Sequence, residues 1–255
     1  MIYVDEQRVV KGICTIARLA GERILQIYQD DFDVQLKADA SPLTEADLAA
    51  HHIITQGLSE LTPAIPILSE EDANIDWAVR QTWQQYWLVD PLDGTKEFIK
   101  KNGEFTVNIA LIENGNPILA VVYAPVLDKL YFSDKSDAFL TTAEQANIPL
   151  RVCNTNGRLK VLVSRSHPST MLSAYLDKLG NYETLEVGSS LKFCLIAEGL
   201  ANLYPRLGPT MEWDTAAGHC IAEKAGAKVC ELDGQALVYN QKESLLNPFF
   251  DVKSF

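Results

Sequence analysis

The sequence predicts helices and an antiparallel sheet in its first part and an α/β arrangement in its second part. Apolar residues recur at helical spacing in residues 6–29 and again in residues 44–61. β-Rich segments follow up to residue 141, and strand-like and helical segments alternate after residue 157. The expected fold class is therefore α+β in the first part and α/β in the second part, with an approximate boundary near residue 155.

Two short strands of the first part are expected to deliver acidic residues. Residues 66–69 are predicted to be a strand with Glu70 and Glu71 at its C-terminal end. The compact apolar run at residues 86–89 is predicted to be a buried strand that ends at Asp90.

The remaining segments complete the predicted order. Asn114-Gly115 is a strong hairpin signal between two β-rich segments. Further strands are predicted over residues 104–112, 117–123, 129–133, 138–141, 161–163, 184–187, 201–204 and 227–231. Further helices are predicted over residues 76–84, 168–179, 190–198 and 214–225. We expect residues 1–155 to carry the metal-site motifs and residues 156–255 to complete a cleft between the two parts, with a single compact unit as the alternative.

Composition and charge limit the function classes. Hydrophobic residues make up 47% and charged residues 22% of the 255 residues, as in ordinary globular proteins. No apolar run approaches the roughly 20 residues of a membrane-spanning helix, and the first residues do not resemble a signal peptide. The net charge of −12 disfavours nucleic-acid polymers but allows an anionic small substrate if metal ions reverse the local charge. We expect a soluble, cytoplasmic protein.

The five cysteines are scattered and form no Cys-x-x-Cys pair. Zinc sites and disulfide frameworks both need closer or more regular spacing. We therefore expect buried free thiols in a reducing compartment.

The strongest candidate site is the run Asp90-Pro91-Leu92-Asp93-Gly94-Thr95. An Asp at the end of a strand, followed by Pro and a second Asp, directs two carboxylates toward one point. Gly94 allows close backbone approach, and Thr95 can open a helix whose free N–H groups face an anion. Carboxylate oxygens are ligands that suit magnesium in phosphate chemistry. Taken alone, the run also describes a capped turn before a helix.

Two distant acidic residues favour the metal-site interpretation. Glu70 ends a predicted strand, and Asp214 begins a predicted helix. Four carboxylates gathered on one side would repel one another unless cations lay between them. The sequence therefore predicts a divalent-cation site, with Glu71 as the neighbouring alternative to Glu70.

Residues 87–95 and 212–218 resemble the two signatures of the inositol monophosphatase superfamily. The resemblance extends from the first helix to about Phe250. Within the superfamily, the chain is most similar to the bacterial 3′(2′),5′-bisphosphate nucleotidases of the CysQ type. The supporting segments are residues 96–99, 103–108, 188–192 and 203–206. The resemblance implies a layered α/β/α/β/α sandwich of the inositol monophosphatase and sugar phosphatase type.

The resemblance also implies the ligands of two or three Mg²⁺ ions. Glu70, Asp90 and the carbonyl of Leu92 would hold one ion. Asp90, Asp93 and Asp214 would hold a second, and Glu70 would help to hold a weaker third.

For catalysis, the resemblance implies that Thr95, oriented by Asp47, helps to activate the attacking water beside Glu70. Asp47 matches the family by position only. Charge neutralisation and positioning must supply most of the acceleration, because phosphate-monoester hydrolysis is among the slowest uncatalysed reactions. The N–H groups of Gly94 and Thr95 are candidates to hold phosphate oxygens.

Two loops of the second part are candidates for substrate recognition. Ser164 and His167 follow a predicted strand, where ligand-contacting loops collect in α/β sheets. Gly188 and Lys192 lie in a segment that resembles the family's second nucleotide-contacting segment, with Lys192 available to a phosphate. The alternative is two ordinary turns, with Ser190 capping a helix. The full set of predicted substrate contacts is Glu70, Leu92, Asp93, Gly94, Thr95, Ser164, His167, Gly188, Lys192 and Asp214.

Three other residues are expected to play lesser roles. Arg206 is expected either to meet a second phosphate or to pair with surface acids. His51 and His52 lie on a predicted helix away from the motifs and are expected to be structural.

The resemblance implies hydrolysis of adenosine 3′,5′-bisphosphate (PAP) to AMP and phosphate in sulfate assimilation, with the sulfated nucleotide PAPS as a second substrate. One alternative is inositol monophosphatase or fructose-1,6-bisphosphatase activity, and another is a metal-dependent phosphonucleotide sensor without turnover. The expected partner is a small phosphonucleotide, with no nucleic-acid polymer and no transmembrane segment. A homodimer is left open. So is weak peripheral association with the cytoplasmic face of the inner membrane, for which no basic amphipathic anchor is visible.

Overall fold

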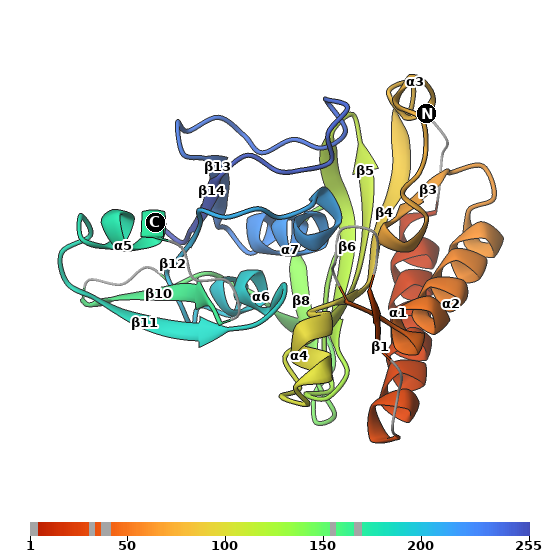
Figure 1. Cartoon of the computed structure of the whole chain (residues 1–255), viewed down its shortest axis with the longest axis horizontal. Coiled ribbons are helices and arrows are strands. Elements are labelled where there is room, and N and C mark those ends of the chain that lie inside the picture. Colours follow the sequence, from red (N-terminus) through yellow and green to blue (C-terminus); the bar gives the residue numbers. More distant parts are fainter. Residues whose placement is uncertain (1–4, 31–33, 37–41, 154–156, 166–169) are drawn as a thin grey trace.

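Two mixed β-sheets organise the computed structural model, which describes residues 5–30, 34–36, 42–153, 157–165 and 170–255 (Figure 1). The larger sheet has the order β3-β4-β5-β6-β7-β8-β9. Its strands are β3 (Ile67–Ser69), β4 (Gln85–Asp93), β5 (Thr106–Glu113), β6 (Asn116–Ala124), β7 (Lys129–Ser133), β8 (Ala138–Thr141) and β9 (Ile148–Pro149). Neighbouring strands are antiparallel except β3 and β4, which are parallel.

The smaller sheet has the order β11-β10-β12-β14-β13. Its strands are β10 (Leu159–Ser164), β11 (Tyr182–Val187), β12 (Leu203–Arg206), β13 (Lys228–Glu231) and β14 (Phe250–Lys253). β10 is parallel to both of its neighbours, whereas β14 is antiparallel to both of its own. A separate hairpin pairs β1 (Val34–Leu36) with β2 (Pro42–Thr44).

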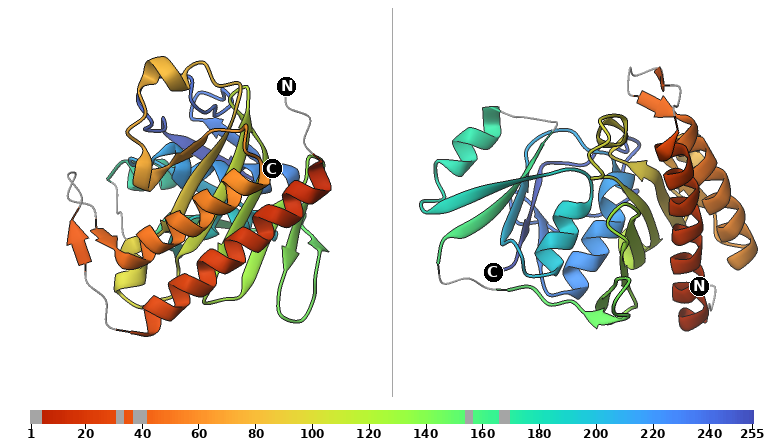
Figure 2. Two further views of the ribbon diagram at one scale, coloured as in Figure 1. Left: turned by 90° about the vertical axis from the view of Figure 1, so that its right-hand side faces the viewer. Right: turned by 90° about the horizontal axis from the view of Figure 1, so that it is seen from below.

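The helices separate these sheets and cover their outer faces. They are α1 (Glu6–Gln29), α2 (Glu45–Leu61), the 3₁₀-helix η1 (Glu70–Asp72), α3 (Trp77–Arg80), α4 (Thr95–Ile99), α5 (Thr170–Leu176), α6 (Leu191–Ala197) and α7 (Glu212–Lys224). α1 and α2 pack on one face of the larger sheet, and α6 and α7 lie between the sheets (Figures 1 and 2). α5 packs on the outer face of the smaller sheet. The predicted α/β/α/β/α layering is confirmed.

Alternation along the central strands explains why both faces of the larger sheet are buried. Val107 and Ile109 of β5 belong to the core under α1 and α2, whereas Ala110 and Ile112 belong to the core around α6 and α7. Because successive side chains point to opposite faces, an apolar strand with both faces covered reads as a nearly continuous hydrophobic run.

The predicted boundary near residue 155 lies in residues 154–156, outside the described residues. The larger sheet lies before this point and the smaller sheet after it. One buried cluster nevertheless includes Leu88 from the first part and Phe193 and Val252 from the second part. The two sheets thus share a core, and the division into two parts stays a prediction.

Two predicted elements of the first part have the wrong length. The helix predicted over residues 76–84 covers only Trp77–Arg80, because the chain turns after Arg80 to begin β4 at Gln85. The strand predicted to end at Asp90 continues to Asp93. Its pairing with β5 is irregular between Asp90 and Asp93, and such an irregularity can accommodate Pro91.

The predicted start of the last helix and part of the cysteine prediction are also wrong. α7 begins at Glu212, so Asp214 lies in its first turn. All five cysteines are free, but Cys153 is exposed and Cys14 and Cys230 are only partly buried. Among the described residues, no helix is both long enough and apolar enough to span a membrane.

Candidate functional site

Three carboxylates converge near the C-terminal ends of β3 and β4. Glu70, Asp90 and Asp214 each offer an oxygen, and these three oxygens all lie within 4.8 Å of one another. The parallel register pairs Ser69 with Val89, so the next residues, Glu70 just after β3 and Asp90 within β4, lie side by side. Asp214 reaches the same point from the first turn of α7.

The electrostatics of this cluster favour a bound cation. Burial raises the pKa of Asp90 well above its ordinary value, and the neighbouring Glu70, Asp93 and Asp214 raise it further. Burial also raises the pKa of Asp214, with Asp93 and Glu70 acting in the same direction. Buried like charges are stable only when they are compensated, and hard carboxylate oxygens are the ligands that Mg²⁺ takes. The donor set therefore fits Mg²⁺.

The backbone of the irregular segment faces this cluster. The N–H group of Leu92 donates to Asp90 Oδ1 at 3.0 Å. The Oγ1 atom of Thr95 lies 3.4 Å from the Leu92 carbonyl oxygen. Leu92 therefore reaches the site through its backbone, whereas its side chain is buried in the core.

Thr95 and Asp47, predicted to act together, are in contact. Thr95 Oγ1 donates to Asp47 Oδ1 at 3.2 Å. The other oxygen of Asp47 accepts from the N–H group of Thr44 at 2.8 Å and from the Thr44 hydroxyl at 2.5 Å. These bonds fix Asp47 at the start of α2. Gly94 makes the sharp turn before Thr95 with φ of +95°, a conformation that favours glycine.

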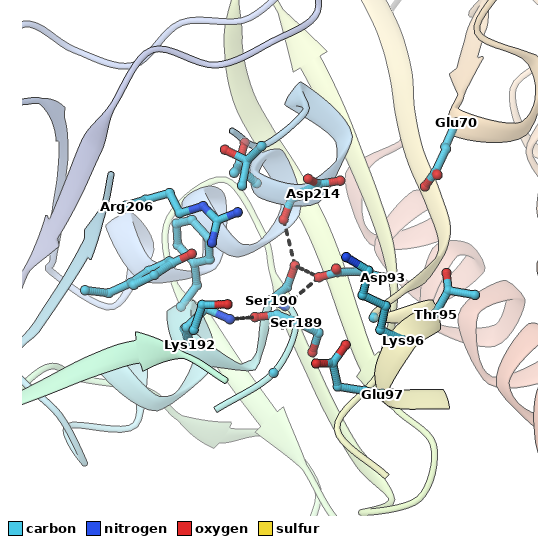
Figure 3. Close-up of a pocket in the computed structure, with 17 residues that line it drawn as sticks. Glu70, Asp93, Thr95, Lys96, Glu97, Ser189, Ser190, Lys192, Arg206 and Asp214 are labelled. Carbon is cyan, nitrogen blue, oxygen red and sulfur yellow. Dashed lines mark hydrogen bonds between the residues drawn. The ribbon is translucent and has the colours of Figure 1, made fainter. Parts of the chain in front are cut away.

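Asp93 is held by Ser190 rather than by the three-carboxylate cluster. Its Oδ2 accepts from the Ser190 N–H group at 2.5 Å, and Ser190 Oγ lies 2.7 Å from both Asp93 Oδ2 and the carbonyl oxygen of Asp214 (Figure 3). Asn108 Nδ2 donates to the same Oγ at 2.8 Å. Ser190 thus joins Asp93 of β4 to Asp214 of α7. The simple helix-cap interpretation of this serine is wrong because its side chain makes no cap hydrogen bond. Metal ligation by Asp93 stays a prediction.

One pocket brings the carboxylates together with the predicted substrate loops (Figure 3). Of the residues predicted from the sequence, its lining contains Glu70, Asp93, Gly94, Thr95, Ser164, Gly188, Lys192 and Asp214. His167 lies outside the described residues. The lining also contains residues that the sequence argument did not select: Lys96, Glu97, Ser189, Ser190, Phe193, Tyr204, Thr210 and Thr215.

Lys192 is a buried cation on the side of the pocket away from Glu70 (Figure 3). Its ammonium donates to the carbonyls of Ser189 at 2.6 Å and Val187 at 3.1 Å, so it also anchors the loop before α6. Burial lowers the pKa of Lys192 to about 8, against the opposing effect of Asp93.

Arg206 is a second buried cation that lines the pocket. The guanidinium donates to the carbonyl of Pro209 at 2.6 Å, while its Nε has no hydrogen-bond partner. The residue is 8% exposed, so the alternative in which it pairs with surface acids is wrong. Burial of an arginine at the end of β12 had no local sequence signal, because it follows from strand pairing with the distant β14.

His51 is closer to the site than the sequence suggested. Its Nδ1 lies 2.9 Å from Ser69 Oγ, in the residue before Glu70. Burial lowers the pKa of His51, and the neighbouring His52 lowers it further. The contact joins α2 to β3, and such a non-local contact is not visible in residue spacing.

Comparison with known proteins agrees with this geometry. A family model described as "Inositol monophosphatase family" matches residues 5–251. The 3′(2′),5′-bisphosphate nucleotidase CysQ of Escherichia coli O6:H1 is 54% identical over 246 residues, which cover 95% of this chain and 98% of the relative. The protein of the same name from Haemophilus influenzae is 35% identical over 253 residues, which cover 98% of this chain and 94% of the relative.

Solved structures show the same fold. The crystal structure of CysQ from Bacteroides thetaiotaomicron, a bacterial member of the inositol monophosphatase family, has a TM-score of 0.84 and 42% identity. The match covers 95% of this chain and 96% of that chain. An inositol monophosphatase from Anabaena has a TM-score of 0.77 at 22% identity, with 97% of this chain and 91% of that chain covered, and shows likeness of fold alone.

Proposed function

The chain belongs to the inositol monophosphatase family, and from this membership we propose that it is a Mg²⁺-dependent 3′(2′),5′-bisphosphate nucleotidase. It hydrolyses the 3′-phosphate of PAP and releases AMP and inorganic phosphate. The observation that carries this proposal is the convergence of Glu70, Asp90 and Asp214 beside one pocket. Glu70 and Asp214 line this pocket together with two buried cations, Lys192 and Arg206. The relatives named as nucleotidases support the choice of substrate.

The metal ligands follow from the carboxylate cluster. Glu70, Asp90, Asp214, the carbonyl of Leu92 and the carboxylate of Asp93 would hold two or three Mg²⁺ ions. Bound Mg²⁺ supplies charge neutralisation at the phosphoryl oxygens and lowers the pKa of the attacking water. Burial and the neighbouring carboxylates raise the pKa of Asp90, and a cation bound among them would offset this effect by favouring the ionised form.

The pair Thr95 and Asp47 handles the proton of the attacking water. Thr95 lines the pocket, and its hydroxyl donates to Asp47 Oδ1. It can accept a proton from water while it passes its own proton to Asp47. Asp47 is held by two bonds from Thr44, which keep this acceptor in a fixed orientation.

The two buried cations explain a preference for a substrate with two anionic groups. When one phosphate lies against the carboxylates and their metal ions, Lys192 and Arg206 lie on the other side of the pocket (Figure 3). A second phosphate, or the sulfated phosphate of PAPS, would offset the cost of burying these positive charges. An inositol monophosphate carries no such second group. PAPS is therefore proposed as a second substrate.

Phosphate release by the purified protein tests this function. PAP, PAPS, inositol 1-phosphate and fructose 1,6-bisphosphate are compared in excess Mg²⁺ and again after EDTA treatment. We expect the highest kcat/KM for PAP and no release from any substrate without Mg²⁺. A higher kcat/KM for inositol 1-phosphate would replace the substrate assignment. Calorimetric binding of PAP without any phosphate release in excess Mg²⁺ would instead indicate a sensor.

The setting of the activity is a further part of the proposal. We propose that the enzyme removes a nucleotide by-product of sulfate assimilation in the cytoplasm. A homodimer and peripheral membrane association stay predictions, which sedimentation and cell fractionation test.

A further inference from the structure

Glu104 joins two loops of the smaller sheet to the larger sheet. It lies just before β5, and its side chain is 25% exposed. One carboxylate oxygen accepts from the Gly188 N–H group at 2.8 Å and from Arg165 Nε at 3.0 Å. The other oxygen accepts from Arg165 Nη2 at 2.9 Å.

These contacts lie just beyond the C-terminal ends of two paired strands. β10 and β11 pair in parallel up to Ser164 and Val187. The residues that follow, Arg165 and Gly188, are the two partners of the Glu104 carboxylate. Glu104 therefore links the loop after β10 to the loop after β11, just beyond the last hydrogen bonds between these strands.

The backbone of Glu104 contacts the same region. A Cβ atom added at Gly188 would lie 2.9 Å from the Glu104 carbonyl oxygen, and one added at Gly94 would lie 3.1 Å from it. Gly94 makes the turn between Asp93 and Thr95, so Glu104 packs between the metal-site turn and a substrate loop. A shift of Glu104 would change the separation of these two segments.

We propose that Glu104 is a specificity-determining positioning residue that sets the distance between the nucleotide-contacting loops. The inference rests on the proposed function. Ser164, Gly188 and Ser189 line the pocket, and their contact with a nucleotide is part of that proposal. An isolated, partly exposed ion pair contributes little. Glu104, however, combines a bidentate arginine contact with a bond from a backbone N–H group, and charge-assisted bonds of this kind are the stronger ones.

This geometry predicts an effect on nucleotide binding without an effect on phosphate chemistry. Glu104 contacts the loops, whereas the three converging carboxylates belong to β4, η1 and α7. Loss of its charge should loosen the hold on the nucleoside part of PAP and AMP. Inorganic phosphate is expected to contact only the carboxylates and their metal ions, so its affinity should be the same as in the wild type.

The test compares Glu104→Gln with the matched control Glu186→Gln. Glu186 Oε2 also faces Arg165, at 3.8 Å from Nη1, but its side chain is 64% exposed, and the Gly188 N–H group donates to Glu104 instead. For Glu104→Gln we expect about a tenfold rise in KM for PAP and in the inhibition constant of AMP. The kcat, the Mg²⁺ half-saturation and the inhibition constant of phosphate should change less than about twofold. For the control, every parameter should stay within about twofold.

A second variant keeps the test independent of general damage. Arg165→Met should raise KM by a similar factor, and the effect of the double variant should be smaller than the product of the two single effects, because both single variants remove the contact between Arg165 and Glu104. Three results would each refute the inference. The KM effects of the two single variants could multiply in the double variant, or KM for PAP could rise as much in the Glu186→Gln control. The third is a rise in the inhibition constant of phosphate as large as the rise in KM for PAP. If the wild-type protein releases no phosphate from PAP, the proposed function fails and this inference fails with it. If the wild type releases phosphate from PAP and Glu104→Gln has the same KM for PAP as the wild type, only this inference fails.

Discussion

The two sides of the pocket are built differently. On the metal side, Asp47 and Asp90 are 2% and 1% exposed and belong to the helix α2 and the strand β4. On the substrate side, Ser164 and Gly188 stand where two strands end, and a partly exposed carboxylate joins their loops. The difference indicates that the chemistry of phosphate hydrolysis is built into the core, whereas substrate choice depends on loops held by a few polar contacts.

The largest effect is expected for Asp90→Asn on the metal side. The substitution removes the central carboxylate of the cluster, so kcat should fall by more than about a thousandfold even in excess Mg²⁺. Because Asp90 is buried among like charges, the metal-free variant should melt no lower than the metal-free wild type. Kinetics and thermal melting check the two results, and near-normal turnover would refute the metal-site assignment.

Asp93→Asn tests the predicted metal ligand that is not part of the three-carboxylate cluster. We expect activity to be abolished while the fold stays intact, because an amide is a poor Mg²⁺ ligand and can still contact Ser190. Near-normal activity would restrict Asp93 to its contact with Ser190.

A smaller effect is expected when the hydroxyl of Thr95 is removed. Thr95→Ala should lower kcat about a hundredfold with little change in KM, because the proton route to Asp47 is broken. Thr95→Ser keeps the hydroxyl and should recover most of the activity. Equal losses in the two variants would mean that the methyl group, rather than the hydroxyl, is needed.

On the substrate side, Lys192→Met should change affinity more than turnover. We expect KM for PAP to rise about tenfold while kcat changes less than about threefold. The pKa of Lys192 lies at about 8, so its positive charge is lost as the pH rises through that value. The wild-type kcat/KM for PAP should therefore fall above pH 8, and this fall should be absent in the variant.

Burial of Lys192 also predicts a stability change with pH. The folded-state pKa lies below the ordinary value of 10.5, so the unfolded chain binds more protons between about pH 8 and 10.5. Over that window, the contribution of Lys192 to folding becomes more favourable as the pH rises. Lys192→Met should remove this contribution, which denaturant unfolding at several pH values measures.

The smallest effect is expected for His51→Ala, which removes the contact with Ser69 Oγ beside Glu70. The variant should lose about 1 kcal/mol of unfolding free energy. Activity should stay within about threefold, because the three carboxylates keep their own anchors. A loss as large as that of Thr95→Ala would show that the metal side depends on this single contact.

The sequence predicted those features that depend on local patterns. α1 has the predicted bounds, and the hairpin at Asn114-Gly115 forms. Thr44 is the N-cap residue of α2, as predicted. Glu70 was found because it follows a strand that could be recognised from a short apolar run, whereas the strand end predicted at Asp90 was wrong although the residue was selected correctly for the cluster.

Features that depend on distant pairing were not predicted. β14 is placed by β12 and β13, and Arg206 is buried because its strand pairs with β14. The role of Ser190 follows from the packing of the start of α6 against β4 and α7, which no residue spacing encodes. Local patterns thus identified the carboxylate cluster more completely than the residues that line the rest of the pocket.

The ratio of kcat/KM for PAP to kcat/KM for inositol 1-phosphate tests the division between the two sides most directly. It is measured for the wild type, for Glu70→Gln on the metal side and for Lys192→Met on the substrate side. We predict that Glu70→Gln lowers both constants by the same factor and leaves the ratio unchanged, whereas Lys192→Met lowers the ratio about tenfold. A ratio that changes as much in Glu70→Gln as in Lys192→Met would contradict the separation of chemistry from substrate choice.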